Sequence, residues 1–192
     1  MANSTTSTHL LVIAQPAGAI PTLLSAAAWV TAAAWLVYTA GLAFSERAGA
    51  QDRRTGLLLW CATVGSLVAG SALASAGIGA SATSELRWSG VAVVWSALAL
   101  GEWSRRCLGH DYHPVVATRV DQQITTSGPY RVIRHPIYLA RIAALGGLGS
   151  LMGSWASAAI CAAVPAVAAV ARIHVEEAAL LAAAGPEYER YR

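Results

Sequence analysis

The stretch that decides the fold is TTSGPYRVIRHPIYLARIAALGGLGSLM, residues 125–152, in which a polar segment gives way at Pro136 to an apolar run. Proline lacks a backbone N–H and fits the first turn of a helix, so Pro136 predicts a helix start with His135 at or beside the N-cap. Gly128-Pro129 favours a turn shortly before it, where Gly128 allows close approach to the backbone. The stretch predicts an apolar helix over 136–152 that is entered from a polar loop.

Apolar runs of the same kind fill most of the chain, which is 56% hydrophobic and only 12% charged. Charged residues make up about a quarter of an ordinary soluble domain. The runs predict membrane spans over 20–44, 57–80, 88–103, 136–152 and 155–171, with small residues in the second span that favour close helix packing. We therefore expect an all-α polytopic membrane protein of about five transmembrane helices, the last two a short helical hairpin, ending in a charged C-terminal helix.

Arginine provides all thirteen basic residues and is unevenly distributed between the predicted loops. The 45–56 loop holds three arginines, the 105–135 segment five and the tail from Arg172 three, whereas Arg87 is alone in the loops between them. The positive-inside rule then predicts that the long segment and the tail are cytoplasmic and that the N-terminus is outside. A net charge of +3 without a basic stripe argues against nucleic-acid binding. The three cysteines are not spaced as metal ligands, so no metal site is expected.

Three charged residues in apolar surroundings are candidate site residues. Arg141 lies one turn inside the predicted fourth span, where an arginine is costly unless it snorkels or faces a partner such as an anionic group. Arg172 and Glu176 are spaced i, i+4, which predicts a simple helical ion pair, whereas Glu177 should point elsewhere. The alternative hypothesis is a functional site, in which Glu176 would hold a cationic or hydroxyl-bearing cofactor and Arg172 an anionic substrate.

These motifs together resemble the isoprenylcysteine carboxyl methyltransferase (ICMT) family, in particular its small prokaryotic members. The similarity covers residues 105–192, through TTSGPYRVIRHPIYLA, then R-x-x-x-E-E-x-x-L from Arg172, then G-x-E-Y-x-x-Y from Gly185. Ala140 and Ala184 depart from the family pattern. The resemblance implies an integral membrane enzyme that transfers a methyl group from S-adenosylmethionine (SAM) to a lipophilic acceptor, typically a prenylcysteine carboxylate. A bacterial inner membrane is the expected location, and membrane lipids are the expected surroundings.

The resemblance also implies one domain, residues 1–192, with a three-helix membrane part in 1–104 and the cofactor-binding and catalytic part in 105–192. Arg172 and Glu176 would be the catalytic pair, with Arg172 on the substrate side and Arg141, placed by position alone, a second substrate contact. The implied cofactor contacts are Gln122, Gln123, Ile124, Thr125, Tyr130, His135, Pro136, Ile137, Tyr138 and Glu176.

Two other functions are also compatible with the sequence. Sterol-type membrane reductases, which use NADPH, share an HPxY-like motif, and a non-catalytic membrane protein would keep the same helices. A carboxylate acceptor needs no general base because it is already ionised near neutrality. An amine or phenol acceptor would need proton removal, for which Glu176 or Glu102 would be the obvious base.

Overall fold

A computed structural model describes residues 26–28, 30–35, 53–81, 83–109 and 125–191 of the chain. This part is helical and contains no strand, in agreement with the predicted all-α class. A short helical segment lies within 26–35; most of the first predicted span, 20–44, is outside the described residues. The elements that follow are α2 (Arg53–Ser75), α3 (Glu85–Leu108), the 3-10 turn η3 (Gly128–Arg131), α4 (Pro136–Leu151), α5 (Trp155–Ala184) and α6 (Pro186–Tyr191).

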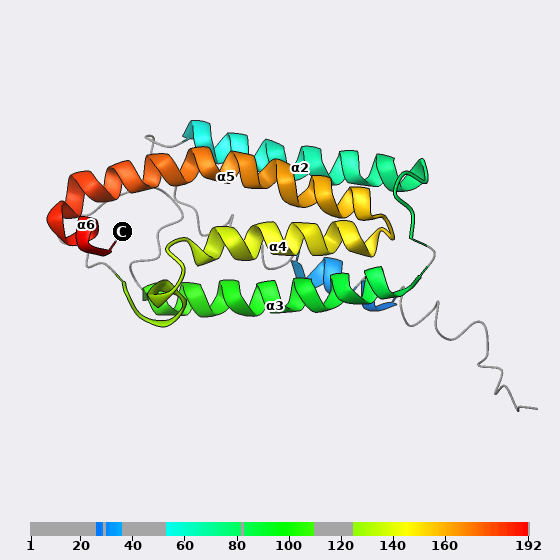
Figure 1. Cartoon of the computed structure of the whole chain (residues 1–192), viewed down its shortest axis with the longest axis horizontal. Coiled ribbons are helices and arrows are strands. Elements are labelled where there is room, and N and C mark those ends of the chain that lie inside the picture. Colours follow the sequence, from blue (N-terminus) through cyan, green and yellow to red (C-terminus); the bar gives the residue numbers. More distant parts are fainter. Residues whose placement is uncertain (1–25, 29, 36–52, 82, 110–124, 192) are drawn as a thin grey trace, which may run out of the picture.

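The four long helices run up and down beside one another, with α4 between α3 and α5, and α5 beside α2 (Figure 1). The helical segment at 26–35 packs on this bundle, since Trp35 shares a buried cluster with Val94 and Leu145. The start of α2, the end of α3, the start of α4 and the end of α5 all lie at one end of the bundle, with η3 and α6 (Figure 1). The described arginines of the three basic segments are therefore on the same side of the molecule, as their distribution predicts.

Small residues allow the helix backbones to approach closely. A Cβ placed on Gly90 in α3 would lie 2.7 Å from the carbonyl oxygen of Gly147 in α4. A Cβ on Gly70 in α2 would lie 2.7 Å from the Sγ of Cys161 in α5. The hydroxyl of Ser157 donates to the carbonyl oxygen of Gly70 over 2.7 Å. Close backbone packing and interhelical hydrogen bonds are the means by which helices associate in lipid.

By length and composition, helices α2 and α5 are long and apolar enough to cross a membrane. They differ from core helices of soluble proteins because large apolar side chains on them are exposed. Leu57, Trp60 and Val68 of α2 are 60–65% exposed, and Val167 of α5 is 74% exposed. Helix α4 has 16 residues, and α3 carries three charges in its last two turns. Two of the predicted spans are thus supported, and the five-span topology stays a prediction.

The prediction that the fifth apolar helix is short and ends at residue 171 was wrong. Helix α5 has 30 residues and continues to Ala184, so the charged residues from Arg172 onward extend the helix that begins at Trp155. Charge marks a change of surroundings but does not end a helix, and the segment 172–184 is rich in Ala, Leu and Glu, which favour helix. The first break comes at Gly185, whose φ of +49° suits glycine. The hairpin therefore joins a short helix to a long one.

The predicted polar segment from residue 105 begins inside a helix. Helix α3 continues to Leu108, and Cys107 lies in its last turn. Glu102 binds Arg105 and Arg106 at 2.8 and 2.7 Å, so this turn carries its own i, i+3 and i, i+4 ion pairs. Gly109, with a φ of +53°, follows the end of the helix.

Candidate functional site

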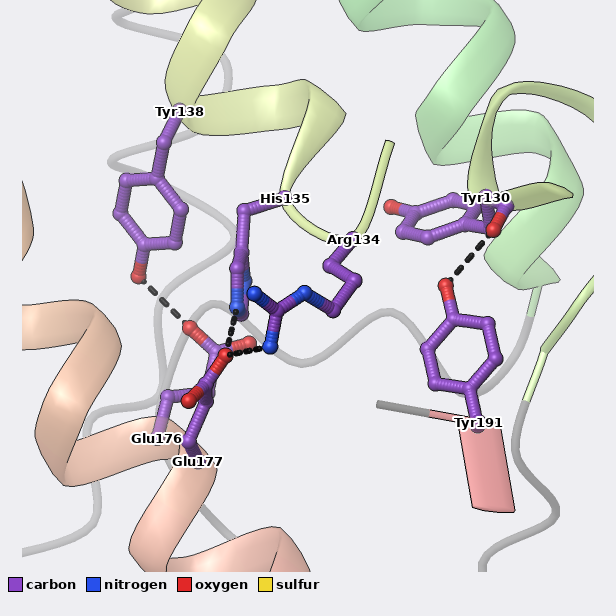
Figure 2. A network of polar contacts seen from close by, with 7 residues as sticks. All are labelled: Tyr130, Arg134, His135, Tyr138, Glu176, Glu177 and Tyr191. Carbon is purple, nitrogen blue, oxygen red and sulfur yellow. Dashed lines mark hydrogen bonds and ion pairs between the residues drawn. The ribbon is translucent and has the colours of Figure 1, made fainter. Parts of the chain in front are cut away.

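The start of α4 meets the middle of α5 through a chain of three side chains. Arg172 Nε donates to the hydroxyl oxygen of Tyr138 over 2.9 Å. The Tyr138 hydroxyl in turn donates to Glu176 Oε2 over 2.9 Å, as Figure 2 shows. Residues 34 and 38 positions apart in sequence are thereby joined, and the two polar segments of the sequence form one site.

The local sequence explains why Tyr138 faces α5. Pro136 occupies the first position of α4, and His135 is its N-cap residue, as predicted. Tyr138 follows in the same first turn. The His135 side chain makes no capping hydrogen bond to its own helix, so its imidazole is available to another element. Its ring lies 5.9 Å from the Tyr138 ring in an edge-on arrangement, and both side chains point toward α5 (Figure 2).

Glu177 is a site residue that the sequence did not predict. Its Oε1 accepts from Arg134 Nη1 at 3.0 Å and lies 3.1 Å from His135 Nε2 (Figure 2). The side chains of Glu177 and His135 are only 13% and 14% exposed. Successive helix residues do point in different directions. The segment before α4, however, lies on the side of α5 that carries Glu177. Arg134 and His135 therefore reach Glu177, while Tyr138 reaches Glu176.

The 3-10 turn η3 and helix α6 close the same end of the molecule. The Tyr191 hydroxyl donates to the carbonyl oxygen of Tyr130 over 2.7 Å (Figure 2). Tyr188 is buried, and burial raises its pKa to about 12 with a further contribution from the Glu177 carboxylate. Gly128 has a φ of +59°, and a Cβ there would lie 2.5 Å from the Sγ of Cys107. The predicted close approach at Gly128 is thus made by the end of α3.

Arg172 and Arg141, the two residues predicted to contact the substrate, both face α2. Arg172 is 9% exposed, and its Nη1 lies 3.5 Å from Thr55 Oγ1 and beside Gly56. Arg141 is half-buried, and its Nη2 donates to Thr63 Oγ1 over 3.3 Å. Arg172 is hydrogen-bonded to Tyr138, and Arg141 lies one turn after Tyr138 on α4, further into the bundle. The direct helical pair predicted for Arg172 and Glu176 is replaced by a link through the Tyr138 hydroxyl.

The remaining predicted residues are placed as follows. Pro136 is buried and Ile137 half-buried at the start of α4, and Tyr130 is buried in η3. Thr125 is half-buried at the beginning of a described stretch, and Gln122, Gln123 and Ile124 lie outside the described residues. Within the described ranges, no group of three or more His, Cys, Asp or Glu side chains is placed to hold a metal ion.

The sequence of this region matches a known family. Residues 90–182 match the model of the Isoprenylcysteine carboxyl methyltransferase (ICMT) family, a range that runs from the first turns of α3 to near the end of α5. No curated protein and no solved structure matches the chain. The match includes the whole Tyr138–Glu176–Arg172 chain and the Arg134–His135–Glu177 cluster. Residues 90–182 are therefore similar to the ICMT family, a family of membrane methyltransferases.

Proposed function

We propose that the chain transfers a methyl group from SAM to the carboxylate of a lipophilic acceptor at the membrane. The observation that carries the proposal is the convergence of Tyr138 from α4 with Arg172 and Glu176 from α5 inside the family domain. An acidic group and a basic group are held there within one helical turn of each other. Such a pair suits two ligands of opposite charge.

The residues present fit SAM chemically. Glu176 uses Oε2 for Tyr138, and no other described residue hydrogen-bonds its Oε1, so one carboxylate oxygen is available for an amino group or a ribose hydroxyl. The start of α4 presents backbone N–H groups with no intrahelical partner, which suit the carboxylate of SAM. When bound, SAM supplies the electrophilic methyl group. The residues that would hold it are Gln122, Gln123, Ile124, Thr125, Tyr130, His135, Pro136, Ile137, Tyr138 and Glu176.

Arg172 supplies the acceptor side of the proposal. Its guanidinium is planar and permanently charged, which favours two-point binding of a carboxylate. Because the acceptor carboxylate is already ionised near neutrality, the protein has no proton to remove. Its task is then to hold the carboxylate in line with the methyl group and to exclude water. Arg141, deeper in the bundle beside Thr63, is proposed as a second contact for an anionic group of the acceptor.

The membrane surroundings support a lipophilic acceptor of the prenylcysteine or fatty-acid kind. The helix bundle that carries the site exposes large apolar side chains on its helices α2 and α5. Arg54, Arg105, Arg106 and Arg134 lie toward the end of the molecule that carries the site, which by the positive-inside rule would face the cytoplasm of a bacterial inner membrane with the N-terminus outside.

Binding of isotopically labelled SAM to the detergent-purified protein tests the cofactor. Saturable binding that excess NADPH does not displace is expected. Binding of NADPH in place of SAM would identify a sterol-type reductase, and binding of neither would identify a non-catalytic membrane protein.

The acceptor is tested by incubating native membranes with methyl-labelled SAM and analysing the extracted lipids by mass spectrometry. A carboxyl methyl ester releases labelled methanol in alkali, whereas an N-methyl or aryl ether product keeps its label. Alkali-labile label in the lipid extract is the expected result. Alkali-stable label would replace the carboxylate with an amine or phenol acceptor.

A further inference from the structure

The Tyr138 hydroxyl stands between the two charged groups to which the proposed function gives different ligands. It lies 2.9 Å from Arg172 Nε and 2.9 Å from Glu176 Oε2. Arg172 and Glu176 are one turn apart on α5, a spacing at which arginine and glutamate side chains reach each other directly. In this structure the phenol from α4 lies between them and is hydrogen-bonded to both.

The direction of the two hydrogen bonds is fixed by chemistry. A guanidinium only donates hydrogen bonds, so the Arg172 Nε–H must donate to the phenol oxygen. The phenol has one hydrogen, and with its oxygen occupied by Arg172 it donates that hydrogen to Glu176. The order is therefore Arg172 to Tyr138 to Glu176. Oε2 of Glu176 is fixed by this bond, and Nη1 of Arg172 lies beside Thr55 and Gly56 of α2.

We infer that Tyr138 is a positioning residue that keeps Arg172 and Glu176 from pairing with each other, so that each charge stays directed at its own ligand. The inference rests on the proposed function, in which Glu176 faces SAM and Arg172 faces the acceptor carboxylate. Without the hydroxyl, the two side chains can form a direct i, i+4 ion pair. Each ligand then has to compete with that internal pair, although neither binding group has been removed.

The test is Tyr138→Phe, which retains the ring and its edge-on contact with His135 and removes only the hydroxyl. Because hydrogen bonds to charged groups are lost, SAM affinity is expected to fall about tenfold, and the KM for a prenylcysteine acceptor to rise about tenfold. The kcat at saturation of both ligands should fall less, because excess ligand restores the orientation. Tyr188→Phe is the matched control, since it removes a hydroxyl from the same end of the molecule and leaves the link between Arg172 and Glu176 intact.

A double variant separates positioning from direct contact with SAM. In the Glu176→Gln background there is no carboxylate to pair with Arg172, so adding Tyr138→Phe should change SAM affinity by less than about twofold. Tyr138→Phe retains the ring that would contact SAM, so the double variant reports on the hydroxyl alone. If the two losses instead multiply, the hydroxyl acts on SAM independently of Glu176 and the inference is overturned. It is overturned too if Tyr138→Phe binds both ligands like the wild type, or if it melts far below the wild type without ligand, which would show that the hydroxyl serves folding.

The proposed function fails in a different way. Absence of SAM binding by the wild-type protein would overturn the methyltransferase proposal and this inference with it. Normal SAM binding by the wild type with an unaffected Tyr138→Phe variant would overturn the positioning role alone.

Discussion

Glu176 and Glu177 are adjacent in sequence and bind different partners in the structure. Glu176 accepts from Tyr138, and Glu177 binds Arg134 and His135. The motif predicted that Glu176 binds the cofactor, and nothing in the helical spacing indicated that Glu177 would join the same cluster. The two carboxylates give the site a concentration of negative charge on α5, opposite the basic start of α4.

The substitution Glu176→Gln tests whether the Glu176 carboxylate binds the cofactor. Glutamine keeps the size of the side chain and can still accept from Tyr138, but it removes the negative charge that would face the amino group or sulfonium of SAM. SAM affinity is expected to fall by about ten- to hundredfold, the value of a charge-assisted hydrogen bond. The dissociation constant can be measured by equilibrium dialysis with labelled SAM. Glu189→Gln on the exposed face of α6 is the charge-matched control, and a Glu176→Gln affinity equal to that of the control would remove Glu176 from the cofactor site.

Arg172→Lys tests the acceptor role. Lysine keeps the positive charge, but it loses the Nε donor to Tyr138 and the planar fork that binds a carboxylate at two points. The kcat/KM for the acceptor is expected to fall by roughly a hundredfold, with a much smaller loss of SAM affinity. Parallel measurements of methyl transfer and SAM binding show whether the substitution affects the acceptor more than the cofactor. Equal losses in the two would show that Arg172 does not distinguish acceptor from cofactor.

At the scale of the helices, contacts between glycine and backbone determine how near the elements lie. Gly90 of α3 and Gly147 of α4 allow these helices to touch backbone to backbone. The start of α4 contributes Tyr138 to the site, so its spacing from its neighbours determines where the phenol lies. The sequence indicated small-residue packing in general terms but not which glycines face each other, because this depends on how the helices are rotated against one another.

Gly90→Ala and Gly65→Ala form a matched pair that tests this packing. A Cβ at Gly90 would lie 2.7 Å from a backbone oxygen that cannot move aside, and we expect destabilisation of about 1–3 kcal/mol. A Cβ at Gly65 in α2 meets nothing within 4 Å, and the same substitution there should stabilise by about 0.5–1 kcal/mol. Thermal unfolding in detergent gives both values. A Gly90→Ala protein as stable as Gly65→Ala would mean that α3 and α4 are not in backbone contact.

For the whole molecule, the arginine-rich end and the site are at the same end of the bundle. The opposite end is closed by contacts between the loop after α2 and the turn before α5. The Ser154 hydroxyl donates there to the carbonyl oxygen of Ile78 over 2.7 Å, and the Ser81 N–H donates to the carbonyl oxygen of Gly153 over 2.8 Å. Arg87 also lies at this end, next to Gly153. The two ends therefore differ in charge, which is the basis for expecting one orientation in a membrane.

Cysteine accessibility measures that orientation. In a variant whose three native cysteines are replaced by serine, Glu189→Cys marks the site end and Ser84→Cys the opposite end, and both positions are exposed. In intact bacterial cells, a membrane-impermeant maleimide is expected to label Ser84→Cys and to leave Glu189→Cys unlabelled until the cells are opened. The reverse pattern would place the site outside the cytoplasm. Labelling of both positions in intact cells would contradict a membrane barrier between the two ends.

The sequence by itself determined the helical class, the start of α4 at Pro136, the apolar character of α2 and of the first part of α5, and the family that residues 90–182 match. These features depend on short-range properties, namely proline geometry, apolar runs and motif spacing, which can be read along one segment. Only the tertiary structure decided that α5 carries the charged motif as part of one long helix, that Glu177 binds His135, and that Tyr138 separates Arg172 from Glu176. Those contacts depend on how α4 and α5 are rotated and offset against each other, and that is fixed by the packing of many small residues along the whole bundle.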